Sequence, residues 1–285
     1  MRTSNITSKT LIYIFMLACL GYFILPLIWL MIASTKTNAG LFNSFGFWFA
    51  KDFNLFENLN ETFTYQDKAF LLWMQNTAIY AISASLGSSF ISALAGYAFS
   101  QYRFFGRRLL FGLVLGSVFV PITVFAVPLY LLVSKTGLSG SLLAVILPTL
   151  VNPFGVYLMR IYADQSIPKD LIDAARVDGA GELRIFATIA FRLLAPGYVT
   201  VLLFAFVGAW NNYFLPLLVL SKSEVYTVTV GLSYWNSLAS LQSSTQVLFP
   251  LVITGSVIGT LPVMLVFLFL QRFWQNGLAL GSIKG

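Results

Sequence analysis

Residues 11–33 read LIYIFMLACLGYFILPLIWLMIA, an apolar run without a single charged residue. A helix of about 20 apolar residues is long enough to cross the hydrocarbon core of a bilayer, which is about 30 Å thick. The run is too long for the apolar part of a signal peptide, and no small-x-small cleavage site follows it, although Arg2 and Lys9 precede it. It therefore predicts an uncleaved membrane span.

The whole composition agrees with this first run. Hydrophobic residues make up 58% of the 285 residues and charged residues only 9%, and a water-soluble domain cannot bury that much apolar surface. We therefore expect an all-α membrane protein with six transmembrane helices in one domain that covers residues 1–285. The six apolar runs are residues 11–33, 70–99, 109–133, 142–159, 194–220 and 247–270.

The arginines indicate which ends of these spans face the cytoplasm. All nine lie in alternate segments, and cytoplasmic segments are the ones enriched in basic residues. This distribution predicts that both termini are cytoplasmic. The nine arginines are Arg2 before the first span, Arg103, Arg107 and Arg108 after the second, Arg160, Arg176, Arg184 and Arg192 after the fourth, and Arg272 after the sixth.

Several classes of function are disfavoured by missing residue types. The chain has no histidine and one cysteine, Cys19, so a zinc site, a disulfide framework and a Ser/His/Asp or Cys/His catalytic set are disfavoured. A membrane enzyme would need clustered carboxylates, histidines or a nucleophile at membrane depth. The spans also hold no ionisable residue near their middle, which argues against an ion-coupled carrier or a channel.

Prolines and small residues recur inside the apolar runs. Gly112 with Gly116 and Gly255 with Gly259 have the four-residue spacing that allows two membrane helices to approach closely. The prolines each remove a backbone hydrogen bond and can kink their helix. Both patterns predict a packed bundle of several helices. The prolines are Pro121, Pro128, Pro148, Pro153, Pro216, Pro250 and Pro262.

The cytoplasmic loop of residues 160–193 is patterned as two short helices. Pro168 suits a helix start, and Asp170 places negative charge at the positive end of the helix dipole. Asp178 and Gly179 then end the helix, because glycine readily takes the left-handed conformation of a tight turn. We call residues 160–193 the coupling loop.

Both helices of the coupling loop are predicted to be amphipathic. The second carries a basic stripe that can reach lipid headgroups, so the pattern fits an interfacial anchor as well as a rigid lever gripped by a partner. The expected apolar face of the first helix is Leu171, Ala174 and Ala175. The second is expected to present Leu183, Phe186, Ala187, Ala190 and Leu194 on one side and Arg184, Thr188 and Arg192 on another.

Residues 173–180 read DAARVDGA, with Gly179 six residues after Asp173 and Ile189 ten residues after Gly179. This spacing resembles the EAA loop of binding-protein-dependent ABC importers. The chain departs from that pattern in having Asp173 for the usual Glu and Phe191 with Arg192 for the usual Leu-Pro. Aspartate keeps the carboxylate group of glutamate on a side chain that is one methylene shorter.

The resemblance extends over nearly the whole chain and is strongest to the smaller, maltose-type permease of carbohydrate importers. It implies the type I ABC importer permease fold in the plasma membrane of a bacterium or archaeon. The matching segments are Asn76-Thr77, the run AGYAF at residues 95–99, the run WNNY at residues 210–213 with Pro216, and the C-terminal residues 271–285.

The resemblance also implies the partners. They are a second homologous permease, two ATPase subunits and an extracytoplasmic solute-binding protein. This chain has no phosphate-binding GxxxxGK[ST] loop, so we expect no cofactor here and Mg-ATP in the ATPase. Asp173 and Asp178 would either contact the ATPase or cap helix ends. The candidates for ATPase coupling are Asp170, Asp173, Ala174, Ala175, Asp178, Gly179, Ala180, Leu183 and Phe186.

A sugar path needs amides for hydrogen bonds and aromatic faces for the sugar ring. The same residue types also serve as contacts between helices or at the membrane interface. The cargo alternatives are a glycerol-phosphate type of ester or an amino acid, and an ATP-independent carrier is a further alternative. The path candidates are Tyr130, Asn152, Tyr157, Trp210, Asn211, Asn212 and Tyr213, and the candidates for contact with the binding protein are Tyr234, Trp235, Asn236 and Ser237.

Overall fold

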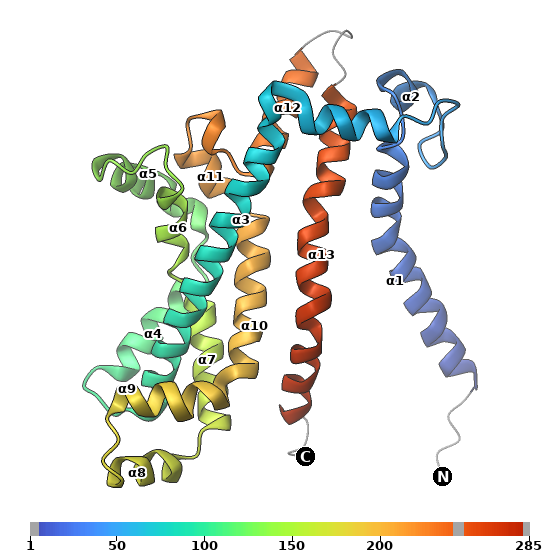
Figure 1. Ribbon diagram of the computed structural model, residues 1–285. Helices are drawn as coiled ribbons and strands as arrows, with labels where there is room; N and C mark the ends of the chain where they lie inside the picture. The colour runs from blue at the N-terminus through green and yellow to red at the C-terminus, as the bar shows by residue number, and fades with distance from the viewer. Residues whose placement is uncertain (1–5, 242–247, 282–285) are drawn as a thin grey trace. The chain divides into compact units, whose positions relative to one another are not determined.

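The computed structural model describes residues 6–241 and 248–281. Across these residues the secondary structure is helical and contains no strand (Figure 1). The long helices are α1 (Ile6–Ala33), α3 (Leu55–Gln101), α10 (Phe191–Trp210) and α13 (Leu248–Gly281). α3 consists of two helices joined at a kink, where Tyr65–Lys68 have non-helical backbone angles. The shorter ones are α2 (Asn38–Asn43), α4 (Arg107–Val118), α5 (Ala126–Lys135), α6 (Leu143–Thr149), α7 (Pro153–Ser166), α8 (Lys169–Val177), α9 (Glu182–Ile185), α11 (Phe214–Val219) and α12 (Val228–Leu241).

Five helices among the described residues are long and apolar enough to cross a membrane, and a bent pair makes a sixth candidate. That pair corresponds to the predicted span 109–133, which is therefore not one straight helix. It consists of Arg107–Val118 and Ile122–Lys135, bent by 99°. The break lies just before Pro121, which has no backbone N–H to donate and so cannot continue the hydrogen-bond ladder.

The other predicted spans coincide with helices of the structure, but the helix ends differ from the predicted ends. The predicted span 70–99 lies within Leu55–Gln101, and 142–159 lies within Leu143–Ser166 except for its first residue. The fifth differs most, because its helical run begins at Glu182 and ends at Trp210, before the predicted end at residue 220. Hydropathy identifies the apolar centre of a span and not the amphipathic turns that extend it.

The expected single domain divides into two compact units. Unit 1 comprises residues 1–71 and 232–260, and unit 2 comprises residues 72–231 and 261–285. The long helices α3 and α13 contribute residues to both.

Unit 1 contains the connection between the first two spans, which folds around a buried lysine. The side chain of Lys36 is 1% exposed, and its ammonium group donates to Ser44 Oγ at 2.9 Å and to the Phe45 carbonyl at 2.8 Å. Asn58 donates to the carbonyls of Ser34 and Lys36 at 2.8 and 3.0 Å. These bonds satisfy polar groups that would otherwise be costly to bury.

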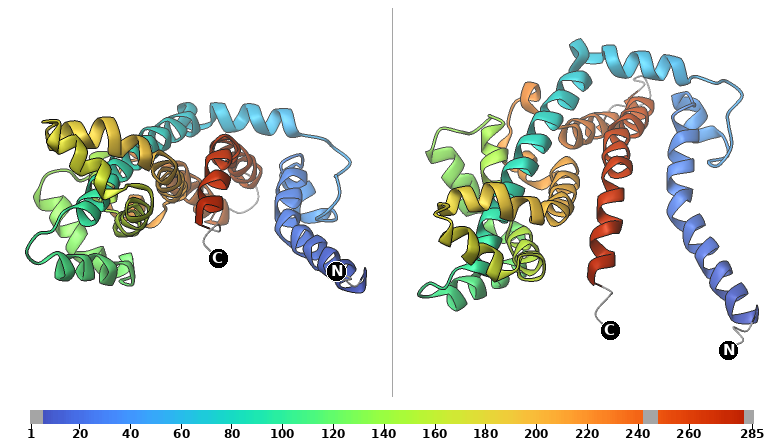
Figure 2. Two further views of the ribbon diagram at one scale, coloured as in Figure 1. Left: turned by 90° about the horizontal axis from the view of Figure 1, so that it is seen from below. Right: turned by 60° about the horizontal axis from the view of Figure 1, so that its bottom comes forward.

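Unit 2 is built around α3, α7 and α10, which lie alongside one another in Figures 1 and 2. Its two apolar clusters lie around Tyr80 with Trp210 and around Tyr97 with Phe186. α3 and α7 meet closely at Gly96, where an added Cβ would lie 2.6 Å from Met159 Cβ and 2.7 Å from the Arg160 nitrogen. Only glycine allows this approach.

Candidate functional site

The coupling loop lies at the end of unit 2 where α3 and α7 finish, and its helices α8 and α9 are labelled there in Figure 1. α8 begins after Pro168, whose extended backbone precedes the first turn. Its last residue is Val177, Asp178 caps it, and Gly179 follows with φ of +78° and donates its N–H to the Arg176 carbonyl at 3.0 Å. The predicted helix end at Asp178 and Gly179 is confirmed.

The faces of α8 differ from the prediction. Ile172 and Ala175 are 1% and 8% exposed and lie in the cluster with Tyr97, whereas Leu171 and Ala174 face outward. The expectation that Leu171, Ala174 and Ala175 share one face is therefore wrong. The buried face is set by Ile172 and Ala175, three residues apart, because these are the positions that reach α3.

The second helical run also differs from a regular helix. Phe186, Ala190 and Leu194 are buried as predicted, and the stripe of Arg184, Thr188 and Arg192 is exposed as predicted. Leu183 is 83% exposed and Ala187 is exposed, so both leave the expected apolar face. A wide π-helical turn over Phe186–Ala190 changes the helical period at this point.

Aromatic packing fixes the coupling loop to the transmembrane helices. The Phe186 ring lies 5.3 Å from that of Tyr97 and 5.9 Å from that of Phe191, measured between ring centroids. Burying a phenylalanine stabilises a fold by about 1.5–3 kcal/mol, and such ring pairs add about 0.5–1.5 kcal/mol. The loop is therefore packed against α3.

Charged groups join α8, α9 and the end of α3. Arg176 binds Glu182 Oε1 through Nε and Asp173 Oδ1 through Nη1, both at 2.8 Å. The Tyr102 hydroxyl donates to Glu182 Oε2 at 2.5 Å, and the Arg176 guanidinium lies 5.7 Å from the centre of the Tyr102 ring. We call Tyr102, Asp173, Arg176 and Glu182 the charged network.

Contacts within the charged network shift the pKa values of Arg176 and Tyr102. The hydrogen bond to Glu182 raises the pKa of Arg176, and burial together with the bond to Glu182 raises the pKa of Tyr102. Arg176 therefore stays charged and Tyr102 stays a neutral donor near pH 7. Because exposed ion pairs contribute only about 0–1 kcal/mol each, the network orients the two helices more than it stabilises the fold.

The sequence did not single out Tyr102, Arg176 or Glu182. Asp173 and Arg176 could have been paired from their three-residue spacing on one helix. Tyr102 lies 80 positions from Glu182, so only the tertiary fold brings them together. Asp173 lies in the middle of α8, away from the helix ends that a capping residue would occupy.

The nine coupling candidates divide by exposure. The exposed ones form an outward surface that combines carboxylates with small and apolar side chains, whereas the buried ones attach the loop to α3. Asp170, Asp173, Ala174, Asp178, Gly179 and Leu183 are exposed, Ala180 is half-buried, and Ala175 and Phe186 are buried.

Two of the path candidates line one cavity in unit 2. Asn152 and Asn212 contribute to a cavity of about 270 Å³, together with Thr149 and the rings of Phe154 and Phe204. The remaining lining residues are Ser88, Ile122, Pro148, Val151, Ala205, Gly208, Ala209 and Leu215.

Both amides of the cavity are held in place. Asn152 Oδ1 accepts from the Gly155 N–H at 2.9 Å at the start of α7. Asn212 Nδ2 donates to the Tyr80 hydroxyl at 2.9 Å. Their orientation is thus set before any solute arrives.

The other path candidates lie elsewhere. Trp210 is 5% exposed in the apolar cluster, and Asn211 donates to the Val207 carbonyl of its own helix at 2.9 Å. Tyr157 stacks with Phe111 at 6.5 Å between ring centroids. Tyr130 and Tyr213 are 47% and 40% exposed and do not line the cavity.

The candidates for contact with a binding protein lie on α12. Trp235 is fully buried within unit 1, where its Nε1 donates to Gln66 Oε1 at 3.0 Å and its ring stacks on Phe70. It does not belong to an outer contact surface in this structure. Tyr234, Asn236 and Ser237 are exposed.

The helices and the coupling loop define a membrane-embedded transport subunit. A family model described as the inner membrane component of binding-protein-dependent transport systems matches residues 87–278. A solved bacterial ABC transporter involved in the import of the acidic polysaccharide alginate has a chain of the same fold. The TM-score is 0.81 over 96% of this chain and 99% of that chain, with 21% identity.

Curated relatives agree with the family model. The chain is 35% identical to the arabinooligosaccharides transport system permease protein AraQ of Bacillus subtilis (strain 168), over 79% of this chain and 78% of that protein. It is 32% identical to the lactose transport system permease protein LacG of Rhizobium radiobacter, over 92% and 91%. The maltodextrin transport system permease protein MdxG of Bacillus subtilis (strain 168) is 32% identical, over 99% of both chains.

The chain belongs to the family of inner-membrane permease components of binding-protein-dependent ABC importers. It is a multi-pass protein of the plasma membrane and a transport subunit, not an enzyme. A member of this family works in a complex with a partner permease, an ATPase and a binding protein.

Proposed function

We propose that this permease forms one half of the path for a neutral sugar or oligosaccharide and receives the conformational change of an ATPase through its coupling loop. The observation that carries the proposal is the cavity with Asn152 and Asn212. Amide groups supply hydrogen bonds to sugar hydroxyls, and the rings of Phe154 and Phe204 supply the apolar faces on which a sugar ring can lie.

The lining of this cavity also discriminates between cargoes. None of its described lining residues is charged. A phosphate ester would need arginine or lysine partners, and an amino acid would need partners for both of its charges. The cavity therefore favours a neutral polar solute, in keeping with the sugars named for the relatives.

The coupling loop supplies the link to ATP. Leu171, Val177 and Leu183 are 42%, 88% and 83% exposed, although the loop is otherwise well packed. An exposed apolar surface flanked by Asp170 and Asp178 on a rigid base suits a cleft in a partner protein. We assign this surface to one of two ATPase subunits, which hold Mg-ATP, and we place the loop and both termini in the cytoplasm. ATP can shift the permease from one conformation to another only if the ATPase binds these two conformations with different affinities.

The remaining partners have separate surfaces. A second, homologous permease would complete the path beside the cavity. The exposed residues Tyr234, Asn236 and Ser237 of α12 are offered to an extracytoplasmic binding protein. Trp235 is not part of this proposed surface, because its side chain is buried.

Uptake of a labelled oligosaccharide by proteoliposomes that contain the complete importer tests the path. Asn212→Ala should lower uptake by about twofold to tenfold, because a neutral hydrogen bond contributes about 0.5–1.5 kcal/mol. Asn211→Ala is the matched control, since Asn211 bonds only within its own helix among the contacts described. Equal uptake by the two variants, with equal thermal unfolding temperatures, would contradict the assignment of Asn212 to the path.

A further inference from the structure

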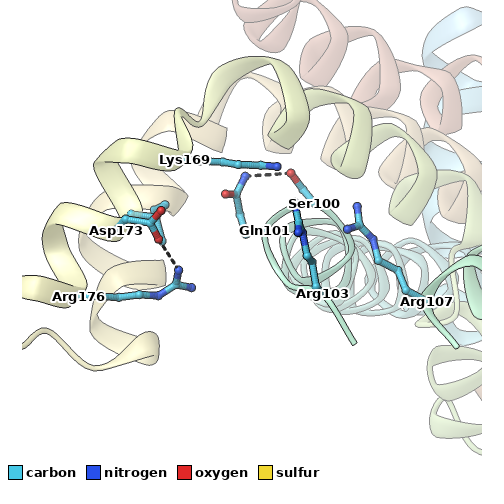
Figure 3. A pocket seen from close by; sticks show the side chains of 8 residues that line it. Ser100, Gln101, Arg103, Arg107, Lys169, Asp173 and Arg176 are labelled. Carbon is cyan, nitrogen blue, oxygen red and sulfur yellow. Dashed lines mark hydrogen bonds and ion pairs between the residues drawn. The ribbon is translucent and has the colours of Figure 1, made fainter. Parts of the chain in front are cut away.

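A second cavity lies between α8 and the end of α3. Its volume is about 220 Å³, and it is bounded by the end of α3, the turn before α4, and α8. Figure 3 shows that the charged ends of Arg103, Arg107 and Lys169 point into the same space. We call this the basic pocket. Its lining residues are Ser100, Gln101, Arg103, Arg107, Lys169, Ile172, Asp173 and Arg176.

The basic pocket has an excess of positive charge. Asp173 is its one acidic lining residue, and its carboxylate is already bound to Arg176 at 2.8 Å. Among the described residues, no ion pair joins Arg103, Arg107 or Lys169 to a carboxylate. Arg107 uses Nη1 to bind the Tyr102 carbonyl at 3.2 Å, which leaves its other N–H groups available. Three cations around one cavity attract an anion with several acceptor oxygens.

Neutral donors complete the lining. Ser100 is 3% exposed, and its hydroxyl oxygen accepts from Gln101 Nε2 at 2.9 Å. The Ser100 hydroxyl hydrogen and the second Gln101 amide hydrogen remain available to an oxygen in the pocket. The pocket thus combines charge with oriented hydrogen-bond donors, as a site for a phosphate group requires.

The surroundings of the basic pocket combine a further arginine, Arg108, with exposed apolar side chains. Phe105 is 104% exposed and Leu109 is 69% exposed. A neighbouring cavity of about 550 Å³ shares Arg103 and Arg107 with the basic pocket and extends to Phe104 and Leu109. A fully exposed aromatic ring beside arginines, in the turn between two membrane helices, is typical of the level of lipid headgroups.

We propose that the basic pocket binds the phosphate group of an anionic phospholipid, whose acyl chains lie along the exposed apolar side of α4. A soluble anion would use the cations but not the adjoining apolar surface. Because Lys169, Asp173 and Arg176 belong to α8, the bound lipid also contacts the base of the coupling loop. Lipid binding itself does not depend on the proposed sugar or on ATP.

The test measures lipid binding by the complete importer in nanodiscs. Discs of phosphatidylcholine alone are compared with discs of equal parts phosphatidylcholine and phosphatidylglycerol, and bound lipid is counted by native mass spectrometry. The variant is Arg103→Gln with Lys169→Gln. The control, Lys135→Gln with Lys222→Gln, removes the same charge from two exposed positions outside the basic pocket.

The wild type and the control should retain phosphatidylglycerol, and the pocket variant should bind it about 30-fold more weakly. Each cation near an anionic surface contributes about fivefold. The variant should unfold at the wild-type temperature in phosphatidylcholine discs. Equal losses in variant and control would attribute binding to overall charge and overturn the proposal. Full displacement of the lipid by inorganic phosphate would also overturn the proposal. So would a cross-link from position 103 to the ATPase whose yield is the same with and without phosphatidylglycerol.

Discussion

At the scale of single residues, Gly179 has the clearest conformational requirement in the coupling loop. Its φ of +78° lies in the left-handed region, and a Cβ added there would meet nothing within 4 Å. The requirement is therefore one of backbone conformation and not of space within this chain. A non-glycine residue pays about 1–2 kcal/mol for this conformation, and a β-branched residue is disfavoured further.

Gly179→Val should leave the importer assembled in the membrane while ATP hydrolysis no longer drives sugar uptake. The β-branched side chain distorts the turn and projects from the surface assigned to the ATPase. The measurement is the ratio of sugar transported to ATP hydrolysed in proteoliposomes.

Gly181→Val is the matched control for this variant, because Gly181 is exposed, has φ of −71° and has equally open surroundings. Gly179→Asn distinguishes the effect of backbone conformation from the effect of side-chain size, since asparagine tolerates the left-handed region. A normal transport ratio in Gly179→Val would refute the requirement.

At the scale of helices, close approaches decide how α3 and α7 fit together. Gly96 faces both Met159 and the backbone of Arg160, whereas Gly112 and Gly116 in α4 have nothing within 4 Å of an added Cβ. The four-residue spacing of Gly112 and Gly116 is therefore not a helix contact within this chain. Spacing alone does not tell which small residues meet a neighbour.

Gly96→Ala should destabilise the permease by about 1–3 kcal/mol, because the new Cβ overlaps backbone atoms that have no room to move. Thermal unfolding in detergent measures the effect. Gly112→Ala should be neutral or slightly stabilising, since alanine is the better helix former by about 1 kcal/mol. Similar unfolding temperatures for both variants would show that α3 and α7 do not meet as described.

At the scale of the whole molecule, unit 2 carries two kinds of surface at one end. The outward surface of α8 and α9 is apolar with flanking carboxylates, and the basic pocket lies on the side toward α3. The charged network and the Phe186 cluster join α8 and α9 to α3. Under the proposed function, we expect displacement of α8 by the ATPase to reach α3 through these packed groups.

Val177→Glu with Leu183→Glu should abolish retention of the ATPase on the purified permease. Both side chains are more than four-fifths exposed, so the substitutions cost little folding free energy but place two charges in an apolar interface. The readout is the stoichiometry of the co-purified complex. Thr188→Glu, on the exposed polar stripe, is the control. Wild-type retention by the double variant would locate the ATPase contact elsewhere.

The sequence by itself determined that the chain is a multi-span membrane protein, where its spans lie and where the first coupling helix ends. These follow from local properties, namely apolar runs such as residues 11–33 and the turn preference of Gly179. They depend on a residue and its close neighbours in the chain, so they can be predicted without a fold.

Only the tertiary structure decided which faces meet. It turned Ala175 inward and Leu183 outward, buried Trp235 against Phe70, bent the predicted span 109–133, and brought Arg103 beside Lys169. Each of these outcomes depends on segments that are distant in sequence. Burial and charge pairing are properties of contacts, and composition and spacing along one helix do not specify the contact partner.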